Sequence, residues 1–156
     1  MNVVDAREFY WAAPPFEEQP LFRAPDDVVA GWVELANLAQ AELERFGIPA
    51  AVVTDDSPNA LGSPAGVQII VSHKRPYGVI LDWEPALAGT IEYKNIVMKQ
   101  SLTSPLLKYV TKANEVMRQA VLSVLSAAEF GIATEISETE HYYRVLSAPQ
   151  TPMLER

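Results

Sequence analysis

Two long stretches with helical periodicity, separated by short runs rich in Val and Ile, constrain the fold of this chain more than any other feature. The first stretch predicts a helix over Val28–Phe46, with Asp26 or Asp27 as its N-cap. We expect Gly47 to end this helix in the left-handed conformation, and Pro49 prevents its continuation. The apolar residues of this stretch follow steps of three and four, which places them on one face: Val28, Trp32, Leu35, Ala39, Leu43 and Phe46.

The second stretch predicts a helix that is capped by Ser104, has Pro105 in its first position and runs to about Phe130. Gly131 is expected to end it with a positive φ, in the same way as Gly47 ends the first helix. The apolar positions of this helix are Leu106, Val110, Ala113, Met117, Val121, Val124 and Ala128.

Short runs rich in β-branched residues predict the strands. Four are expected between the helices and two after the second helix: Ala50–Thr54, Gly66–Ser72, Gly78–Trp83, Thr90–Met98, Ala133–Ser137 and Glu140–Ser147. The five residues from His73 to Tyr77 predict a hairpin connection between the second and third strands. The order α-β-β-β-β-α-β(-β) therefore predicts an α+β two-layer sandwich. Its mostly antiparallel sheet of four to six strands carries the two long helices on one face.

The same patterns predict the core and the limits of the folded domain. The expected core consists of Trp32, Leu35, Val67, Ile69, Val71, Val110, Met117, Val121 and Leu125. Residues 26–147 are expected to form a single domain, and residues 148–156 a loose C-terminal tail. Residues 1–25 hold many aromatic residues and four prolines, so we expect an extended arm without a regular helix.

Composition excludes several classes of function. The 156 residues include no cysteine, which excludes disulfides, thiolate metal sites and a cysteine nucleophile. The formal net charge of -8 disfavours nucleic-acid binding, because the phosphate backbone would be repelled. No stretch of 18 apolar residues occurs, so no membrane span is expected. These features favour a cytoplasmic protein that needs no cofactor or metal.

A sheet covered by helices on one face leaves its second face for water or for another protein. Ile70, Ile80 and Ile96 are expected to project from that face. The N-terminal arm, a twofold partner or a client protein could cover this second face. The candidate partner-binding residues are Tyr10, Trp11, Phe16, Ile70, Ile80 and Tyr143. We expect a homodimer or a complex with a protein partner. A basic partner would fit the acidic surface.

The polar clusters favour ordinary surface roles. His73, Lys74 and Arg75 form the one basic cluster and are candidates for anion binding, although hairpin tips often carry charge without binding anything. The carboxylates of Asp82, Glu84 and Glu92 are candidates for acid–base chemistry, and outward carboxylates are also expected on a solvated sheet face.

Two further segments contain residue types that occur in functional sites. Glu138, Glu140 and His141 have the residue types of a metal site, and Asp55-Asp56 could add oxygen ligands, but nothing in the sequence makes them converge. The loop at Gly62-Ser63-Pro64 lacks the lysine of a phosphate loop and the elbow motif of serine hydrolases. Neither segment predicts a defined chemistry.

Two hypotheses on function follow. The first is a non-enzymatic protein-interaction module of the immunity-, secretion-chaperone- or assembly-adaptor-like kind, which uses the acidic surface and a sheet face. The second is a small hydrolase or ligand-binding enzyme that uses a carboxylate and histidine cluster. The absence of a convergent catalytic motif favours the first.

Overall fold

The computed structural model describes residues 3–12, 23–54, 65–74, 76–99, 103–136 and 141–151. Its elements in chain order are α1 (Ala6–Ala12), α2 (Asp26–Arg45), β1 (Ala50–Thr54), β2 (Gly66–Ser72), β3 (Gly78–Glu84), the 3-10 helix η2 (Ala86–Gly89), α3 (Ile91–Met98), α4 (Pro105–Ala127), β4 (Gly131–Ile136) and β5 (His141–Ser147).

Five strands form one sheet in the order β1-β2-β3-β5-β4. β1 runs parallel to β2, and every other neighbouring pair is antiparallel. The hairpin expected between the second and third strands joins β2 and β3, where Val67 pairs with Trp83 and Ser72 with Gly78. The predicted α+β class with a mostly antiparallel sheet is confirmed.

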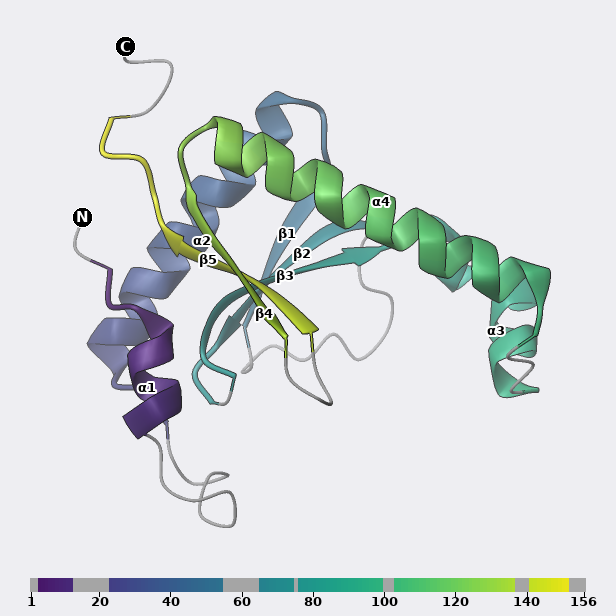
Figure 1. The fold of residues 1–156 in the computed structure, drawn as a ribbon, viewed down its shortest axis with the longest axis horizontal. Helices are drawn as coiled ribbons and strands as arrows, with labels where there is room; N and C mark the ends of the chain where they lie inside the picture. The colour runs from purple at the N-terminus through teal and green to yellow at the C-terminus, as the bar shows by residue number, and fades with distance from the viewer. Residues whose placement is uncertain are drawn as a thin grey trace.

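The two long helices cover one face of the sheet (Figure 1). α2 packs along β1, β2 and β3, whereas α4 contacts β3, β4 and α2. The N-terminal half of α4 extends beyond the strands, and α3 lies at that far end (Figure 1). The molecule therefore has a body and a projecting part.

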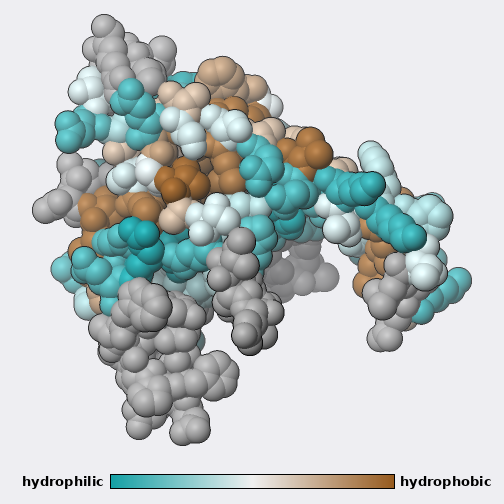
Figure 2. All heavy atoms as spheres, in the orientation of Figure 1, coloured by the Kyte–Doolittle hydropathy of each residue, from teal (hydrophilic) through white to brown (hydrophobic). Residues whose placement is uncertain are grey.

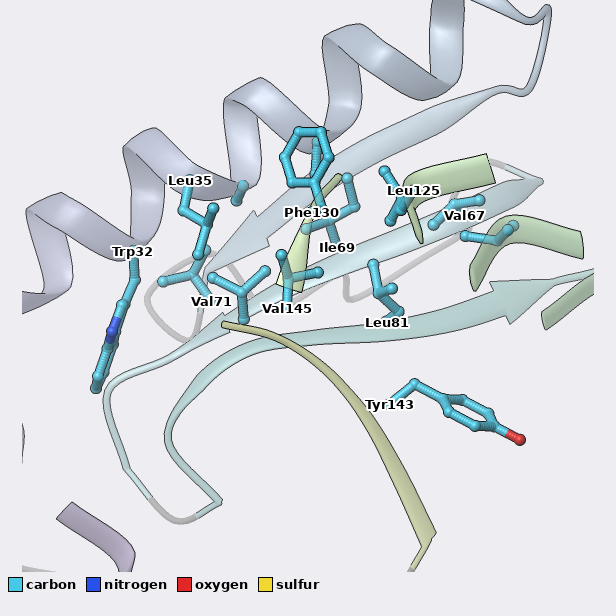
Figure 3. Packing of buried hydrophobic residues seen from close by; sticks show 14 of the residues in the cluster. Trp32, Leu35, Val67, Ile69, Val71, Leu81, Leu125, Phe130, Tyr143 and Val145 are labelled. Atoms are coloured by element: carbon cyan, nitrogen blue, oxygen red, sulfur yellow. The ribbon is translucent and has the colours of Figure 1, made fainter. Parts of the chain in front are cut away.

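The core lies between the helices and the helix-facing side of the sheet (Figure 3). Alternation along β2 and β3 directs every second side chain into this layer. Of the predicted core residues, Met117 alone is half-buried, and the others are buried: Trp32, Leu35, Val67, Ile69, Val71, Val110, Val121 and Leu125. Trp32 also satisfies its indole N–H, because Nε1 donates a hydrogen bond of 2.9 Å to the carbonyl oxygen of Val4.

The strand predicted over Thr90–Met98 is wrong, because this segment forms α3. The Thr90 hydroxyl accepts a hydrogen bond of 3.3 Å from the Tyr93 N–H and caps the helix. The apolar positions of so short a segment fit the period of a strand as well as that of a helix. The Thr90 cap and the preceding 3-10 turn favour the helix. Ile96 is therefore a helical residue and does not project from the sheet.

The expectation of an arm without a helix is also wrong in part. α1 precedes the first proline, Pro14, so the exclusion of helices by proline does not reach it. Phe9 of α1 packs edge-on against Trp32, with ring centroids 5.7 Å apart, and lies 6.0 Å from the Tyr77 ring. α1 is thus attached to the body by aromatic contacts.

The helix ends follow the expected chemistry at one position and depart from it at others. α2 begins at Asp26 with Pro25 as N-cap, and neither aspartate caps it with a side-chain hydrogen bond. Gly47 has φ 74° and ends α2 as predicted. Gly131 is absent from the residues with positive φ, and Glu129, with φ 67°, takes the left-handed position after α4. The Phe130 N–H donates to the carbonyl oxygen of Leu125 at 3.0 Å, which completes this helix end.

Gly31 and Gly47 provide a matched pair of glycines for a stability test. No atom lies within 4 Å of a Cβ built on either residue, so substitution by alanine changes backbone preference and not packing. Gly31→Ala in the interior of α2 should stabilise the protein by about 0.5–1 kcal/mol. Gly47→Ala should destabilise it by about 1 kcal/mol, because an L-residue is strained at positive φ. Urea unfolding of both variants measures the two signs, and equal signs would contradict the assigned helix end.

Candidate functional site

Two of the candidate partner-binding residues are buried in the structure. Ile80 is 7% exposed and Tyr143 is 4% exposed, so neither is available on the surface. Ile70 is half-buried on the second face of the sheet. The side chains of Tyr10 and Trp11, together with Phe16, lie outside the described residues. The sheet face is therefore a weaker docking surface than the sequence indicated.

A buried arginine, Arg144, lies on the second face of the sheet, which the long helices do not cover. Arg144 is fully buried and projects from β5 on the same side as Ile80, its register partner. It forms an ion pair with Glu135, and its Nη2 and Nε donate to the carbonyl oxygens of Pro76 and Tyr77 at 2.5 and 3.2 Å. These bonds connect β5 and β4 to the β2–β3 turn and stabilise a buried charge that would otherwise be costly.

The structure describes two of the three residues of the basic hairpin tip, and these two differ in exposure. His73 is buried, and its carbonyl oxygen accepts a hydrogen bond of 2.8 Å from the Ala24 N–H. Lys74 is exposed, and Arg75 lies outside the described residues. His73 is therefore not available as an exposed ligand.

The carboxylates proposed for acid–base chemistry are separated. Glu92 lies on α3, so it does not share a sheet face with Asp82 and Glu84. Asp82 instead pairs with α4, since Arg118 Nη2 lies 2.9 Å from its Oδ1. Among the described residues, no group of three or more histidines or carboxylates has the arrangement of a metal site. Glu138 and Glu140 lie outside the described part of the chain, as do Asp55, Asp56 and Gly62-Ser63-Pro64.

One polar network does connect α4 to the sheet. The Tyr143 hydroxyl donates to Glu115 Oε1 at 2.6 Å, and Gln119 Nε2 donates to both groups, at 3.1 Å to Tyr143 and 2.9 Å to Glu115. The His141 ring lies 4.8 Å from the Tyr143 ring. This network contains an acid, a phenol and an imidazole, and so its electrostatics decide whether it can perform proton transfer.

The carboxyl group and the phenol of this network have pKa values shifted away from neutrality. Hydrogen bonds from Tyr143 and Gln119 hold the pKa of Glu115 below its ordinary value. Burial, followed by the bond to Glu115, raises the pKa of Tyr143 above its ordinary value. A general acid or base works best with a pKa near the working pH. The network therefore favours a structural contact between α4 and β5 over acid–base catalysis.

A groove lies between the ends of α2 and α4. It has a volume of about 650 Å³. Its walls are formed by residues from both helices: Glu42, Arg45, Phe46, Ser123, Val124, Ala127 and Ala128. Phe46 follows the last turn of α2 and is 69% exposed, although its spacing placed it on the apolar stripe of that helix. An open groove with an exposed aromatic wall is typical of a surface that binds a partner.

The charged residues of the groove neutralise each other. Arg45 Nη1 lies 2.6 Å from Glu42 Oε2, and both residues also line a smaller hollow of about 80 Å³ beside Leu38 and Phe130. The ion pair therefore separates two apolar hollows. Because it is internally paired, it offers little to orient a small polar ligand, and an apolar side chain suits the groove better.

The outer face of α4 continues from this groove toward the projecting end. Tyr109 and Val116 are 64% and 67% exposed, and they lie at seven-residue steps from Ser123 in the groove. The exposed positions on this face follow steps of three and four: Tyr109, Lys112, Val116, Ala120, Ser123 and Ala127. We call these six residues the outer stripe. The sequence contained this signal as a second spacing in the helix, next to the one that predicted the core.

Hydrophobic surface is present at both ends of α4. Figure 2 shows hydrophobic spheres gathered where α2 and α4 end, and again at the projecting end of the molecule. At that projecting end, Ile91, Val97 and Met98 of α3 are exposed. Within the described residues, no helix has the length and apolar character that crossing a bilayer requires.

Comparisons with known proteins add no relative. A scan against protein-family models found no match, and searches of curated proteins and of solved structures found no significant match either. The groove and the outer stripe are therefore the observations on which a function can be argued.

The network at Tyr143 predicts a pH-dependent stability. A lowered folded pKa means that Glu115 stabilises the fold above its unfolded pKa, near 4.5, and that this contribution is lost as the pH falls through the folded pKa. The stability difference between wild type and Tyr143→Phe should therefore be present at neutral pH and shrink in acid. It should stay below about 1 kcal/mol, because the Glu115 side chain is 46% exposed.

Thermal unfolding across pH measures this difference, and Glu115→Gln provides the control. In the Glu115→Gln background, Tyr143→Phe should cost the same amount at every pH, because the titrating carboxylate is absent. A wild-type difference that grows as the pH falls would contradict the assignment.

Proposed function

We propose that this protein is a protein-interaction module whose docking surface is the groove between the ends of α2 and α4. The exposed Phe46 ring beside an apolar hollow of about 650 Å³ carries the proposal. Burying such a ring against a partner removes a large apolar side chain from water, which contributes roughly 1.5–3 kcal/mol. A soluble chain that leaves this ring exposed has a binding surface ready for use.

The chemistry of the groove indicates the kind of partner. Its lining is apolar apart from Ser123 and the internally paired Glu42 and Arg45. A partner that presents an aromatic or aliphatic side chain from a helix fits between two helix ends, as in other helix-in-groove complexes. We propose the class of non-enzymatic interaction module that immunity-, secretion-chaperone- and assembly-adaptor-like functions share.

The enzyme hypothesis has less support. The shifts of Glu115 and Tyr143 oppose titration near neutral pH, and the expected grouping of Asp82 with Glu92 does not form. Among the described residues that line the groove, the acid Glu42 and the base Arg45 pair with each other, and no further titratable group is present to act on a substrate. A docking role uses all the features of the groove.

Site-specific photo-crosslinking in cells of the source organism tests this proposal. A photo-reactive amino acid in place of Phe46 should form a protein adduct, whereas the same amino acid in place of Glu44 should form much less. Glu44 is a suitable control because it is exposed on the same helix end but does not line the groove.

A charge placed in the groove gives a second control. Ala127→Arg should reduce the adduct at Phe46 about tenfold or more, since an arginine would occupy the apolar hollow. Ser126→Arg, on the neighbouring exposed position outside the lining, should leave the adduct unchanged. An equal adduct from Phe46 and Glu44, or one insensitive to Ala127→Arg, would contradict the proposal.

A further inference from the structure

The charge of this acidic chain is divided between its two parts. Residues 86–112, which comprise η2, α3 and the start of α4, contain four of the 12 basic residues and one of the 20 acidic residues. This segment carries +3 and the whole chain -8, so the rest of the chain carries -11. The cations are Lys94, Lys99, Lys108 and Lys112.

The basic segment is also the part that projects from the body (Figure 1). α3 makes its main contacts with η2 and α4, and none of its residues is buried. The first half of α4 presents Tyr109 and Val116 to solvent beside Lys108 and Lys112. A cationic, partly apolar projection is complementary to an acidic surface that has an apolar hollow.

Such a surface exists on the same molecule, at the other end of α4. The groove lies in the part of the chain that carries the net charge of -11, and its own charged residues, Glu42 and Arg45, pair with each other. The projection of one copy cannot reach its own groove, because both lie on one straight helix and Tyr109 is roughly 27 Å from Ala127 at about 1.5 Å per residue. A second copy can provide the match.

We propose that two copies associate through their α4 helices, packed antiparallel along the outer stripe, with Tyr109 of each copy in the groove of the other. This deepens the proposed function, because it names a second copy of this chain as the partner of the groove. The arrangement is reciprocal, as a twofold interface requires, so both Tyr109 rings and both Phe46 rings are buried at once. The twofold axis then crosses α4 close to Val116.

The pairing has further physical support. Ala120, Ser123 and Ala127 are small, which lets the two helices approach closely near the groove. Antiparallel packing brings Lys108 and Lys112 of one copy toward the body of the other, which carries the net negative charge, and the two helix macrodipoles oppose each other favourably. An anionic bilayer would also attract the lysines, but it would leave the groove and Phe46 unfilled, and so a second copy accounts for more of the surface.

Light scattering of the full-length protein during size exclusion tests this interface. The wild type should have a mass near twice the 17.2 kDa of one chain. Val116→Arg places two like charges across the twofold axis and should raise the dissociation constant at least about 100-fold. Thr111→Arg makes the same change in charge at an exposed position off the outer stripe and should leave the dimer intact.

Two further measurements keep the outcome clear. Circular dichroism should show the same helix content for both variants, and added salt should weaken the wild-type dimer because opposite charges meet in it. With the photo-reactive amino acid at Phe46 and a mixture of isotope-labelled and unlabelled chains, the adduct should map to residues 109–116 of the other copy.

Several results would overturn the inference. The first is a wild-type chain that is monomeric at about 100 μM, a concentration well above the Kd of a stable homodimer. The second is a dimer that Val116→Arg does not weaken. The third is a monomer that binds vesicles of anionic phospholipid. If the chain is monomeric and Phe46 still crosslinks to a different protein, this inference fails and the proposed function stands. If Phe46 forms no specific adduct, both fail.

Discussion

The packing of α2 and the second half of α4 against a single face of the sheet determines the rest of this structure. Leu35 and Leu125 are fully buried in that layer and connect the two helices to β2 and β3. Because the layer ends with the sheet, it can accept only part of a 23-residue helix. The first half of α4 is therefore left without a sheet beneath it, and the ends of the two helices meet at an open groove instead of a closed core.

This division explains why the surface has two different characters. On the second face of the sheet, the body buries Arg144, which pairs with Glu135 and donates hydrogen bonds to the β2–β3 turn. The network of Tyr143, Glu115 and Gln119 fixes the middle of α4 to β5. Both polar clusters thus hold the body together, and the apolar surface that is left for association lies along α4 and at the groove.

The sequence was sufficient for the features that depend on local patterning and failed where tertiary context decides. The spacing of Trp32 and Leu35 predicted a buried helix face, and the hairpin residues predicted the pairing of β2 with β3. Phe46 belongs to the same stripe by its spacing but is exposed, because it follows the last turn of α2 and lines the open groove. The segment Thr90–Met98 is too short for its period to distinguish strand from helix. The groove could not be predicted, since it arises where two segments far apart in the sequence meet.

The central claim is that another protein surface covers α4 and the groove. Amide hydrogen exchange at low and high protein concentration measures this cover directly, because exchange reports local opening along each helix. The account predicts that amides of residues 105–120 and 42–46 exchange at least about tenfold more slowly in the concentrated protein, while those of β2 and β3 do not change. Exchange along α4 that is independent of concentration, with or without a co-purified partner, would contradict the account.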